Sequence, residues 1–311
     1  MTATVSVALV TYRRPEQLRT ALQSVRNLDH PAPGYDWTTT IVVDNDPDQS
    51  AKAVCAEFAD LPGFSYRVQD RPGIAAARNL VLDVCGTDFV GFFDDDEEVS
   101  PSWLRALTQR QAATGAAAVV GPVEYRYEQP PPAWVTATAT WASESPAPDA
   151  DAGWLTTNNA LLQATIAQRL TDGRAAAFDD EFGFDGEDYQ LGLRLQRDGF
   201  RIAFAPDAAA TEWVPPHRTT RQAIIRRLLR DGNIMSRADL SLRRGPAKLL
   251  VRARHIVVGA ARVGGGLFRG LFRLPRGGLA GAASGARTSL IGAGQMLGAV
   301  NVVVSSHRRR A

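Results

Sequence analysis

The sequence lacks the features that mark a secreted or disulfide-stabilised protein. Its 311 residues include only two cysteines, Cys55 and Cys85, which are far apart and form no CxxC pair. Two isolated cysteines build no disulfide framework, so we expect free thiols in a reducing compartment. The first ten residues contain no basic segment followed by a long apolar core, so we expect no signal peptide.

Acidic residues are scarce in the last third of the chain. Residues 218–311 carry 19 Lys and Arg but only two acids, Asp231 and Asp239, whereas residues 1–217 carry 16 basic and 31 acidic side chains. The formal charges of these two parts, +17 and −15, are hidden in a net charge of +2. A basic, glycine-rich tail of this kind predicts an anionic partner. Few aromatic residues alternate with the basic ones, so the stacking that single-stranded nucleic acids need is not expected.

Long uncharged runs are also scarce. Thr288–Ser306 is 19 residues without charge, nearly long enough to span a membrane, but it contains several glycines, Gln295 and Asn301. We therefore favour helices that lie in the membrane interface, formed by this run and by Ile256–Leu274. Arginines, including those of residues 307–310, would hold these helices against anionic lipid. A helical subdomain, or a partly disordered tail with ordinary surface arginines, is the alternative.

The composition changes after about residue 240. We expect a first domain at residues 1–240 and a basic, amphipathic helical tail at residues 241–311. A chain of this length can form one large domain or two ordinary ones, each with a sizeable core.

The first domain is organised around one stretch. Five residues without charge, Phe89–Phe93, run directly into five carboxylates, Asp94–Glu98. An uninterrupted apolar run of this length is typical of a strand buried on both faces of a parallel sheet, and ligands bind beyond the carboxyl ends of such strands. If the strand stays extended, Asp94 and Asp96 point the same way and Asp95 points oppositely. Paired carboxylates at a sheet edge suit Mg²⁺ or Mn²⁺, although a solvated acidic turn would show the same residues.

Other segments predict an α/β fold with a mostly parallel sheet flanked by helices. Val5–Val10 and Ile41–Val43 are strand-like, and a helix beginning at Pro15 separates them, which predicts a βαβ unit. Ala116–Val123 and Arg201–Ala205 are further strand-like stretches. A helix over Thr220–Arg230 has an apolar face and a face of arginines. The arginine face is either exposed to solvent or binds phosphates. Residues 128–153 are rich in Pro, Ala and Asp and are typical of a long loop. In this loop and just beyond it, we expect burial more than sugar stacking for the tryptophans Trp134, Trp141 and Trp154.

Several polar residues fall where such a sheet would place a binding site. Asp44 follows the second strand and could accept a hydrogen bond from a base or ribose, or serve as a turn residue. Gly73–Asn79 opens a helix whose N-terminus favours an anion, and Arg78 within it could reach a phosphate or remain on the surface. Glu187 and Asp188 begin another helix, where the helix dipole keeps a carboxylate ionised. Such a group can accept a proton from a hydroxyl, although acids are common in first helical turns for structural reasons.

Taken together, the motifs resemble the family 2 glycosyltransferases, which are inverting enzymes of the GT-A fold. Four segments carry the resemblance in the family's order: VALVTYRRPEQL, IVVDND, GIAAARN with FFDDDEE, and FDGEDYQLGLRLQRDGFRI. They extend over roughly residues 4–232, and their co-occurrence is more specific than any one of them. VVGPVEYRYEQPPPAW and TEWVPPHRTT resemble the subgroup that builds bacterial exopolysaccharides of the succinoglycan kind.

The resemblance implies roles for matching residues. Asp94 and Asp96 match the two ends of the family's DxD motif, so both are expected near a divalent metal, with Asp96 the main ligand. Asp188 matches the acid that acts as the base, with Glu187 as its neighbour. Glu212 stands where many relatives have a metal-binding His, and His217 follows slightly later. The residues expected to hold the donor nucleotide are Thr11, Arg14, Asp44, Arg78, Asp94 and Asp95.

The function implied is hexosyltransferase-type transfer, with inversion, from a nucleotide-diphosphate-sugar donor to a hydroxyl of a glycan or lipid-linked acceptor. Mg²⁺ or Mn²⁺ would assist, because negative charge develops on the leaving nucleoside diphosphate. The resemblance places this activity in cell-surface polysaccharide synthesis. From the free thiols and the basic tail we expect a cytoplasmic enzyme, peripheral to the inner face of the plasma membrane. A catalytically silent nucleotide-sugar-binding scaffold at the membrane is the alternative from another class. A nucleotidyltransferase is the nearest enzymatic one.

Overall fold

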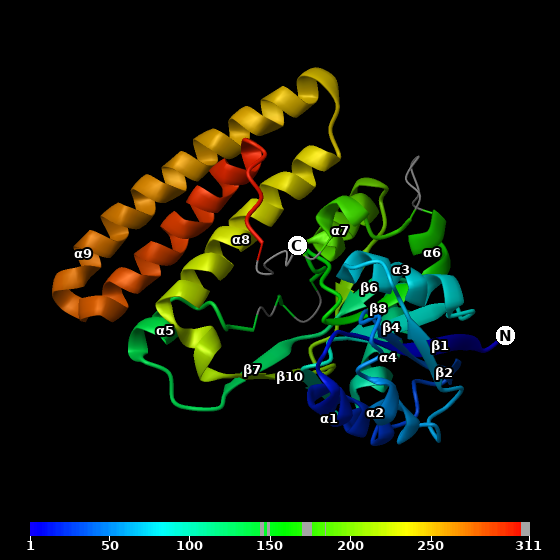
Figure 1. Ribbon diagram of the computed structural model, residues 1–311. Helices are drawn as coiled ribbons and strands as arrows, with labels where there is room; N and C mark the ends of the chain where they lie inside the picture. Colours follow the sequence, from blue (N-terminus) through cyan, green and yellow to red (C-terminus); the bar gives the residue numbers. More distant parts are fainter. Residues whose placement is uncertain (144–145, 148–149, 170–175, 184, 306–311) are drawn as a thin grey trace. The chain divides into compact units, whose positions relative to one another are not determined.

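The structure is a computed structural model that describes residues 1–143, 146–147, 150–169, 176–183 and 185–305 (Figure 1). The chain divides into two compact units. The first, here called the sheet unit, comprises Met1–Glu124, Ser143–Gly183 and Glu187–Glu212, and the second, the helical unit, comprises Tyr125–Ala142, Phe184–Gly186 and Trp213–Ala311. This division differs from the boundary expected at residue 240, because helix α8 (Arg221–Ser241) belongs to the helical unit.

A seven-stranded sheet forms the centre of the sheet unit, in the order β3-β2-β1-β4-β8-β6-β9. All neighbouring pairs are parallel except those of β8, which runs antiparallel to β4 and β6. The predicted mostly parallel sheet is therefore confirmed. The strands are β1 (Ala3–Thr11), β2 (Tyr35–Asp44), β3 (Ser65–Val68), β4 (Phe89–Phe93), β6 (Ala118–Val120), β8 (Asn159–Gln163) and β9 (Ile202–Phe204).

Strand β4 lies inside this sheet, and every one of its residues is buried, as its apolar sequence predicts. Val90 and Phe92 belong to the core cluster on the face covered by helices α3 (Ile74–Val84) and α7 (Glu187–Arg197). The opposite face meets Trp103, the first residue of helix α4 (Trp103–Thr114). A Cβ at Gly91 would lie 2.9 Å from that indole ring, so only glycine fits there without a shift.

Helices cover both faces of the sheet (Figure 1). Helix α1 begins at Pro15, whose fixed φ suits a first helical turn, and its buried side is apolar. The helices of the sheet unit are α1 (Pro15–Arg26), α2 (Lys52–Ala56), α3, α4 (Trp103–Thr114), α6 (Ala164–Arg169), α7 and the short 3₁₀ helix η1 (Asp180–Phe182).

Beside the large sheet, β5 (Glu97–Val99) pairs antiparallel with the start of β10 (Ala210–Val214). Strands β7 (Val123–Tyr127) and β10 each cross the division between the units.

The helical unit is built on two long helical elements. It contains α5 (Ala133–Ala137), the 3₁₀ helix η2 (Pro216–Thr219), α8 and α9 (Gly245–Ala299). Helix α9 is interrupted at Gly278, whose φ of 54° reverses the chain into a helical hairpin (Figure 1). Its second segment packs closely on α8: a Cβ at Gly232 would lie 2.0 Å from the carbonyl oxygen of Ile291. Trp141 is buried in the apolar cluster of this unit, and Trp134 is partly buried against it, as the burial interpretation expects.

Residues 288–299 of the uncharged run form the end of α9, which stops at Ala299. Its Gln295 is only 3% exposed and accepts a hydrogen bond from Arg262 Nη1 at 2.7 Å. Among the residues that the structure describes, no helix combines the length and the apolar character that crossing a membrane requires. The basic residues 307–310 lie outside the described part of the chain.

Both cysteines are free and buried. Burial, and then the nearby Asp44 carboxylate, raises the pKa of the Cys55 thiol to about 12. Because the thiolate is the reactive form, Cys55 should be inert at mildly alkaline pH while the chain is folded. We expect iodoacetamide to leave Cys55 unmodified in the native protein and to alkylate it after unfolding in urea, as peptide mass spectrometry would show. Rapid alkylation of Cys55 in the native chain would contradict this assignment.

Candidate functional site

The site lies at the carboxyl edge of the parallel strands in the sheet unit. Thr11 ends β1 and is the register partner of Asp44, which ends β2. Asp94 follows directly after β4, the other neighbour of β1. The sheet therefore brings together three polar positions that are far apart in the sequence, at the edge where ligands bind in α/β folds.

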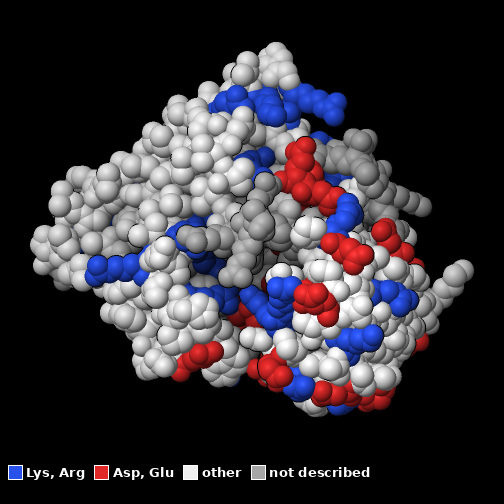
Figure 2. All heavy atoms as spheres, viewed as in Figure 1, with Lys and Arg blue, Asp and Glu red and all other residues white. Residues whose placement is uncertain are grey.

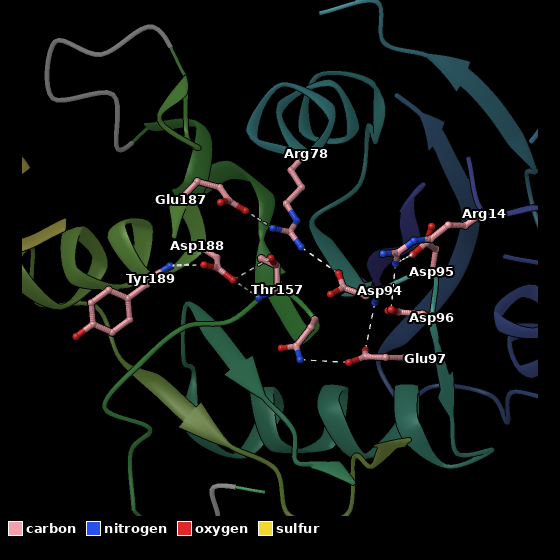
Figure 3. A network of polar contacts seen from close by, with 11 residues as sticks. Arg14, Arg78, Asp94, Asp95, Asp96, Glu97, Thr157, Glu187, Asp188 and Tyr189 are labelled. Carbon is pink, nitrogen blue, oxygen red and sulfur yellow. Dashed lines mark hydrogen bonds and ion pairs between the residues drawn. The ribbon is translucent and has the colours of Figure 1, made fainter. Parts of the chain in front are cut away.

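The chain turns immediately after β4, and this turn redirects the aspartates. The Glu97 N–H donates to the Asp94 carbonyl oxygen at 3.2 Å, so Asp94–Glu97 is not extended. Arg14 Nη1 donates to both Asp95 Oδ1 at 3.2 Å and Asp96 Oδ2 at 3.0 Å, whereas Asp94 bonds a different arginine (Figure 3). The predicted alternation, with Asp95 opposite to Asp96, is wrong here because it assumed that the strand continues.

Asp95 is buried against the end of β1. Its Oδ2 accepts a hydrogen bond from Thr11 Oγ1 at 2.6 Å. Burial raises the pKa of Asp95 to about 7, although Arg14 and the Thr11 hydroxyl favour the ionised form. Thr11, Arg14 and Asp95, all predicted to bind the donor, thus form one hydrogen-bonded group.

Arg78 occupies the middle of the site with a side chain that is only 5% exposed. Its Nη2 donates to Asp94 Oδ1 at 3.1 Å, and its Nη1 is bonded to Glu187 Oε1 (Figure 3). It therefore links the acidic turn after β4 to the N-terminus of α7. Burial raises the pKa of Asp94, and repulsion from Asp96 and Asp188 adds to this effect, while Arg78 opposes it.

The two acids at the start of α7 have different surroundings. Glu187 is 1% exposed and is bonded to Arg78. Asp188 is partly exposed: its Oδ1 accepts the Tyr189 N–H at 2.7 Å, and its Oδ2 accepts the Thr157 N–H at 3.1 Å. These backbone donors hold the Asp188 carboxyl group in one orientation. Of the two, Asp188 is the one accessible to a proton donor.

The structure adds Glu97 to the site and gives a partner to Glu212, which sequence analysis had placed where many relatives have a metal-binding His. Glu97 and Glu212 are register partners across β5 and β10. Glu97 also accepts hydrogen bonds from the Asp94 N–H and from Asn158 Nδ2, both at 3.2 Å. Burial, followed by repulsion from Asp94 and Glu212, raises the pKa of Glu97 well above its usual range. The signal available in the sequence was the run of five carboxylates. Nothing there marked Thr157 or Asn158.

Asp44 has a local structural role in this geometry. It is fully buried, and its oxygens accept hydrogen bonds from the Asp46 N–H at 3.0 Å, the Ala51 N–H at 2.9 Å and the Tyr66 hydroxyl at 2.9 Å. These bonds fix the loop after β2. Its contact with a donor base or ribose stays a prediction. His217, raised as a possible metal ligand, is exposed on η2 of the helical unit.

Carboxyl groups outnumber cations at this edge. The arginines within the network described are Arg14 and Arg78, and the carboxyl groups are those of Asp94, Asp95, Asp96, Glu97, Glu187, Asp188 and Glu212. The surplus of carboxyl groups and their hard oxygen donors suit a divalent cation. In the described part of the chain, no three His, Cys, Asp or Glu side chains converge to hold a metal by themselves. A cation here would take one or two protein ligands and complete its coordination with phosphate oxygens and water.

A parallel sheet with an acidic turn at its carboxyl edge, faced by a second pair of acids on a helix, is the arrangement expected of a GT-A glycosyltransferase. The family model of Glycosyl transferase family 2 matches residues 6–172, more than half of the chain. A second model, Glycosyl transferase family group 2, matches residues 90–267. The chain belongs to glycosyl transferase family 2, as predicted.

Individual proteins agree with this assignment. The chain is 33% identical over 242 residues to the succinoglycan biosynthesis protein ExoM of Rhizobium meliloti (strain 1021), covering 75% of this chain and 74% of ExoM. Among solved structures, it resembles the mannosyltransferase PcManGT from Pyrobaculum calidifontis, in complex with GDP-Man and Mn²⁺. The TM-score is 0.59 at 16% identity, over 94% of this chain and 86% of that one. It also resembles S. aureus TarS, with a TM-score of 0.51 at 14% identity over 78% of this chain, and spans 44% of TarS. These structural likenesses confirm the GT-A fold.

Proposed function

We propose that this glycosyltransferase moves a sugar, with inversion, from a nucleotide-diphosphate-sugar donor to a hydroxyl of a glycan or lipid-linked acceptor. The observation that carries the proposal is the arrangement around Arg78. The acidic turn after β4 lies on one side of this guanidinium, and the acids of α7 lie on the other. One side can hold the leaving diphosphate while the other accepts the proton of the attacking hydroxyl.

The donor side comprises the carboxyl ends of β1, β2 and β4. The Arg14 side chain is 44% exposed, so its guanidinium can turn from Asp95 and Asp96 to a phosphate. Thr11, Asp44 and Asp95 border the same edge and would contact the nucleoside. Asp96, with Asp94, would ligate Mg²⁺ or Mn²⁺. When bound, the cation would stabilise the negative charge that develops on the diphosphate.

Asp188 is proposed as the base. Its carboxyl group is accessible and is oriented by two backbone N–H groups. When it deprotonates the acceptor hydroxyl, that oxygen can attack the anomeric carbon. The bond from this oxygen to the sugar forms as the bond to the diphosphate breaks, and the carboxylate takes the proton. Glu187 would position Arg78, which in turn fixes Asp94.

The biological setting is a proposal as well. The 33% identity to a succinoglycan biosynthesis protein supports a role in cell-surface polysaccharide synthesis. Two buried free thiols and the basic helical unit support a cytoplasmic enzyme, peripheral to the inner face of the plasma membrane. We assign catalysis to the sheet unit and membrane contact to the helices of the helical unit.

The test is thermal stability in the presence of nucleotide-diphosphate sugars. A ligand that binds only the folded state stabilises it by about 2.7 kcal/mol at a hundred times its Kd. We expect some donor to raise the melting temperature, and to raise it further with Mn²⁺. Asp96→Ala should remove the Mn²⁺-dependent increment, whereas Asp48→Ala, which changes a carboxylate that is 80% exposed, should keep it.

Three outcomes would redirect the proposal. If no nucleotide sugar stabilises the chain under either condition, the donor assignment fails. If donors bind but an acceptor screen detects no release of nucleoside diphosphate, the chain is a silent scaffold. Release of pyrophosphate would indicate a nucleotidyltransferase.

A further inference from the structure

The hairpin of α9 exposes an unusual group of large apolar side chains close to its turn at Gly278. Phe268 and Leu271 are each 72% exposed, and the rings of Phe268 and Phe272 stack with centroids 6.3 Å apart. Contiguous apolar patches are uncommon on soluble proteins and mark interaction surfaces. We call this group the hairpin tip. Its members are Leu267, Phe268, Leu271, Phe272, Leu274 and Leu279.

The hairpin has its smallest residues inside and its largest outside. A Cβ at Gly266 would lie 2.6 Å from the carbonyl oxygen of Gly285, and one at Gly270 would lie 3.2 Å from that of Ala282. The two segments therefore touch through glycine and alanine, while the neighbouring leucines and phenylalanines point outward. In a hairpin surrounded by water, burial would favour the opposite arrangement. This arrangement favours an apolar contact outside the tip.

The charges of this region identify that environment. The chain has no Asp or Glu after Asp239, and residues 245–299 carry eight Lys and Arg, of which Arg269 and Arg273 are exposed within the tip. On the face shown in Figure 2, no acidic atoms lie over the α9 hairpin. The two acids of α8 are already paired, Asp231 with Arg230 at 3.0 Å and Asp239 with His255 at 3.0 Å.

A second copy of this chain fits such a surface poorly, because each copy would bring Arg269 and Arg273 to the contact with no acid to pair with them. Nucleic acid would use the cations but leave the leucines and phenylalanines unexplained. An anionic lipid surface satisfies both features, because acyl chains accept the apolar side chains and headgroup phosphates accept the arginines.

We propose that the hairpin tip inserts into the interface of an anionic bilayer, with Arg269 and Arg273 at the level of the headgroups. This deepens the membrane association proposed above by naming the segment that enters the lipid. It differs from the sequence-based expectation, in which Thr288–Ser306 and Ile256–Leu274 both lie flat in the interface. Gln295 of the former run is instead buried in the helical unit.

The experiment is sedimentation of the full-length chain with vesicles of phosphatidylcholine alone, or of phosphatidylcholine and phosphatidylglycerol in equal parts. Phe268→Ser/Phe272→Ser should weaken partitioning onto the anionic vesicles by roughly a hundredfold, because two phenyl groups no longer leave water. Arg269→Gln/Arg273→Gln should weaken it by roughly tenfold to thirtyfold.

The matched control is Leu249→Ser/Leu250→Ser. These leucines are 64% and 73% exposed, but they lie near the start of α9, about 30 Å along the helix from the tip. We expect this variant to partition as the wild type does. Equal loss in the control and tip variants would show that the helix lies flat, and would overturn insertion by the tip.

Two further results would also overturn the proposal. One is a wild-type chain that fails to sediment with anionic vesicles. The other is a concentration-dependent dimer in ultracentrifugation that Phe268→Ser/Phe272→Ser abolishes, which would assign the tip to a second copy. Turnover with a water-soluble acceptor is measured in parallel and should be unchanged in the tip variants. If the wild-type chain transferred no sugar, the vesicle result would still stand. The hypothesis of sugar transfer and the hypothesis of membrane insertion therefore fail separately.

Discussion

Asp188→Asn should lower kcat by ~10²–10⁴-fold and leave the Kd of the donor near its wild-type value. The amide keeps the shape of the carboxylate but cannot accept the proton of the acceptor hydroxyl. The two N–H donors around Asp188 come from Tyr189 and Thr157. The amide keeps one acceptor oxygen for them, so the cost in stability is expected to be about 1 kcal/mol, the contribution of one hydrogen bond. Steady-state kinetics beside calorimetric donor titration measures both quantities.

Glu187→Gln is the matched comparison, because it makes the same chemical change one residue away. Glu187 is buried against Arg78, so neutralising it should reduce thermal stability more than Asp188→Asn does, and kcat less. The roles of the two acids are reversed if Glu187→Gln abolishes turnover while Asp188→Asn stays near wild type. If both variants lose donor binding, the pair belongs to the donor side and the base lies elsewhere.

Local sequence patterns predicted the structure correctly where it depends on a single strand or a single helix terminus. The apolar run Phe89–Phe93 became a fully buried strand, and Pro15 begins a helix, because burial and backbone geometry act within a few residues there. The side chains that a residue contacts across the fold could not be predicted from the sequence. Arg78 resembled any helical arginine, and its bonds to Asp94 and Glu187 depend on contacts 16 and 109 positions away.

The acidic turn and the tail show why the remaining details could not be predicted. The alternation rule holds only while a strand continues, and the turn at Asp94–Glu97 ends it, which sends Asp96 to Arg14. In α9, glycine, leucine and phenylalanine all count as apolar, so hydrophobic periodicity could not tell the inner side of the hairpin from the outer one. The close approach of Gly266 to Gly285 makes that distinction, and it exists only in the folded hairpin.

Arg78→Met should destabilise the chain by about 3–5 kcal/mol, the usual cost of removing one partner from a buried ion pair. Methionine keeps much of the length of the side chain but leaves Glu187, whose side chain is 2% exposed, without its bonded cation. Asp94 loses a guanidinium that now opposes the rise in its pKa. Chemical denaturation without ligand measures this effect separately from any loss of donor binding.

Arg71→Met is the control for Arg78→Met. Arg71 pairs with Asp180 at 3.0 Å, but the two side chains are 66% and 53% exposed, so this change should cost no more than about 1 kcal/mol. The double variant Arg78→Met/Glu187→Met should recover part of the stability lost in Arg78→Met, because it removes the uncompensated buried charge. Equal small losses for Arg78→Met and Arg71→Met would mean that Arg78 does not hold the acidic turn to α7, and the two sides of the site would then need another connection.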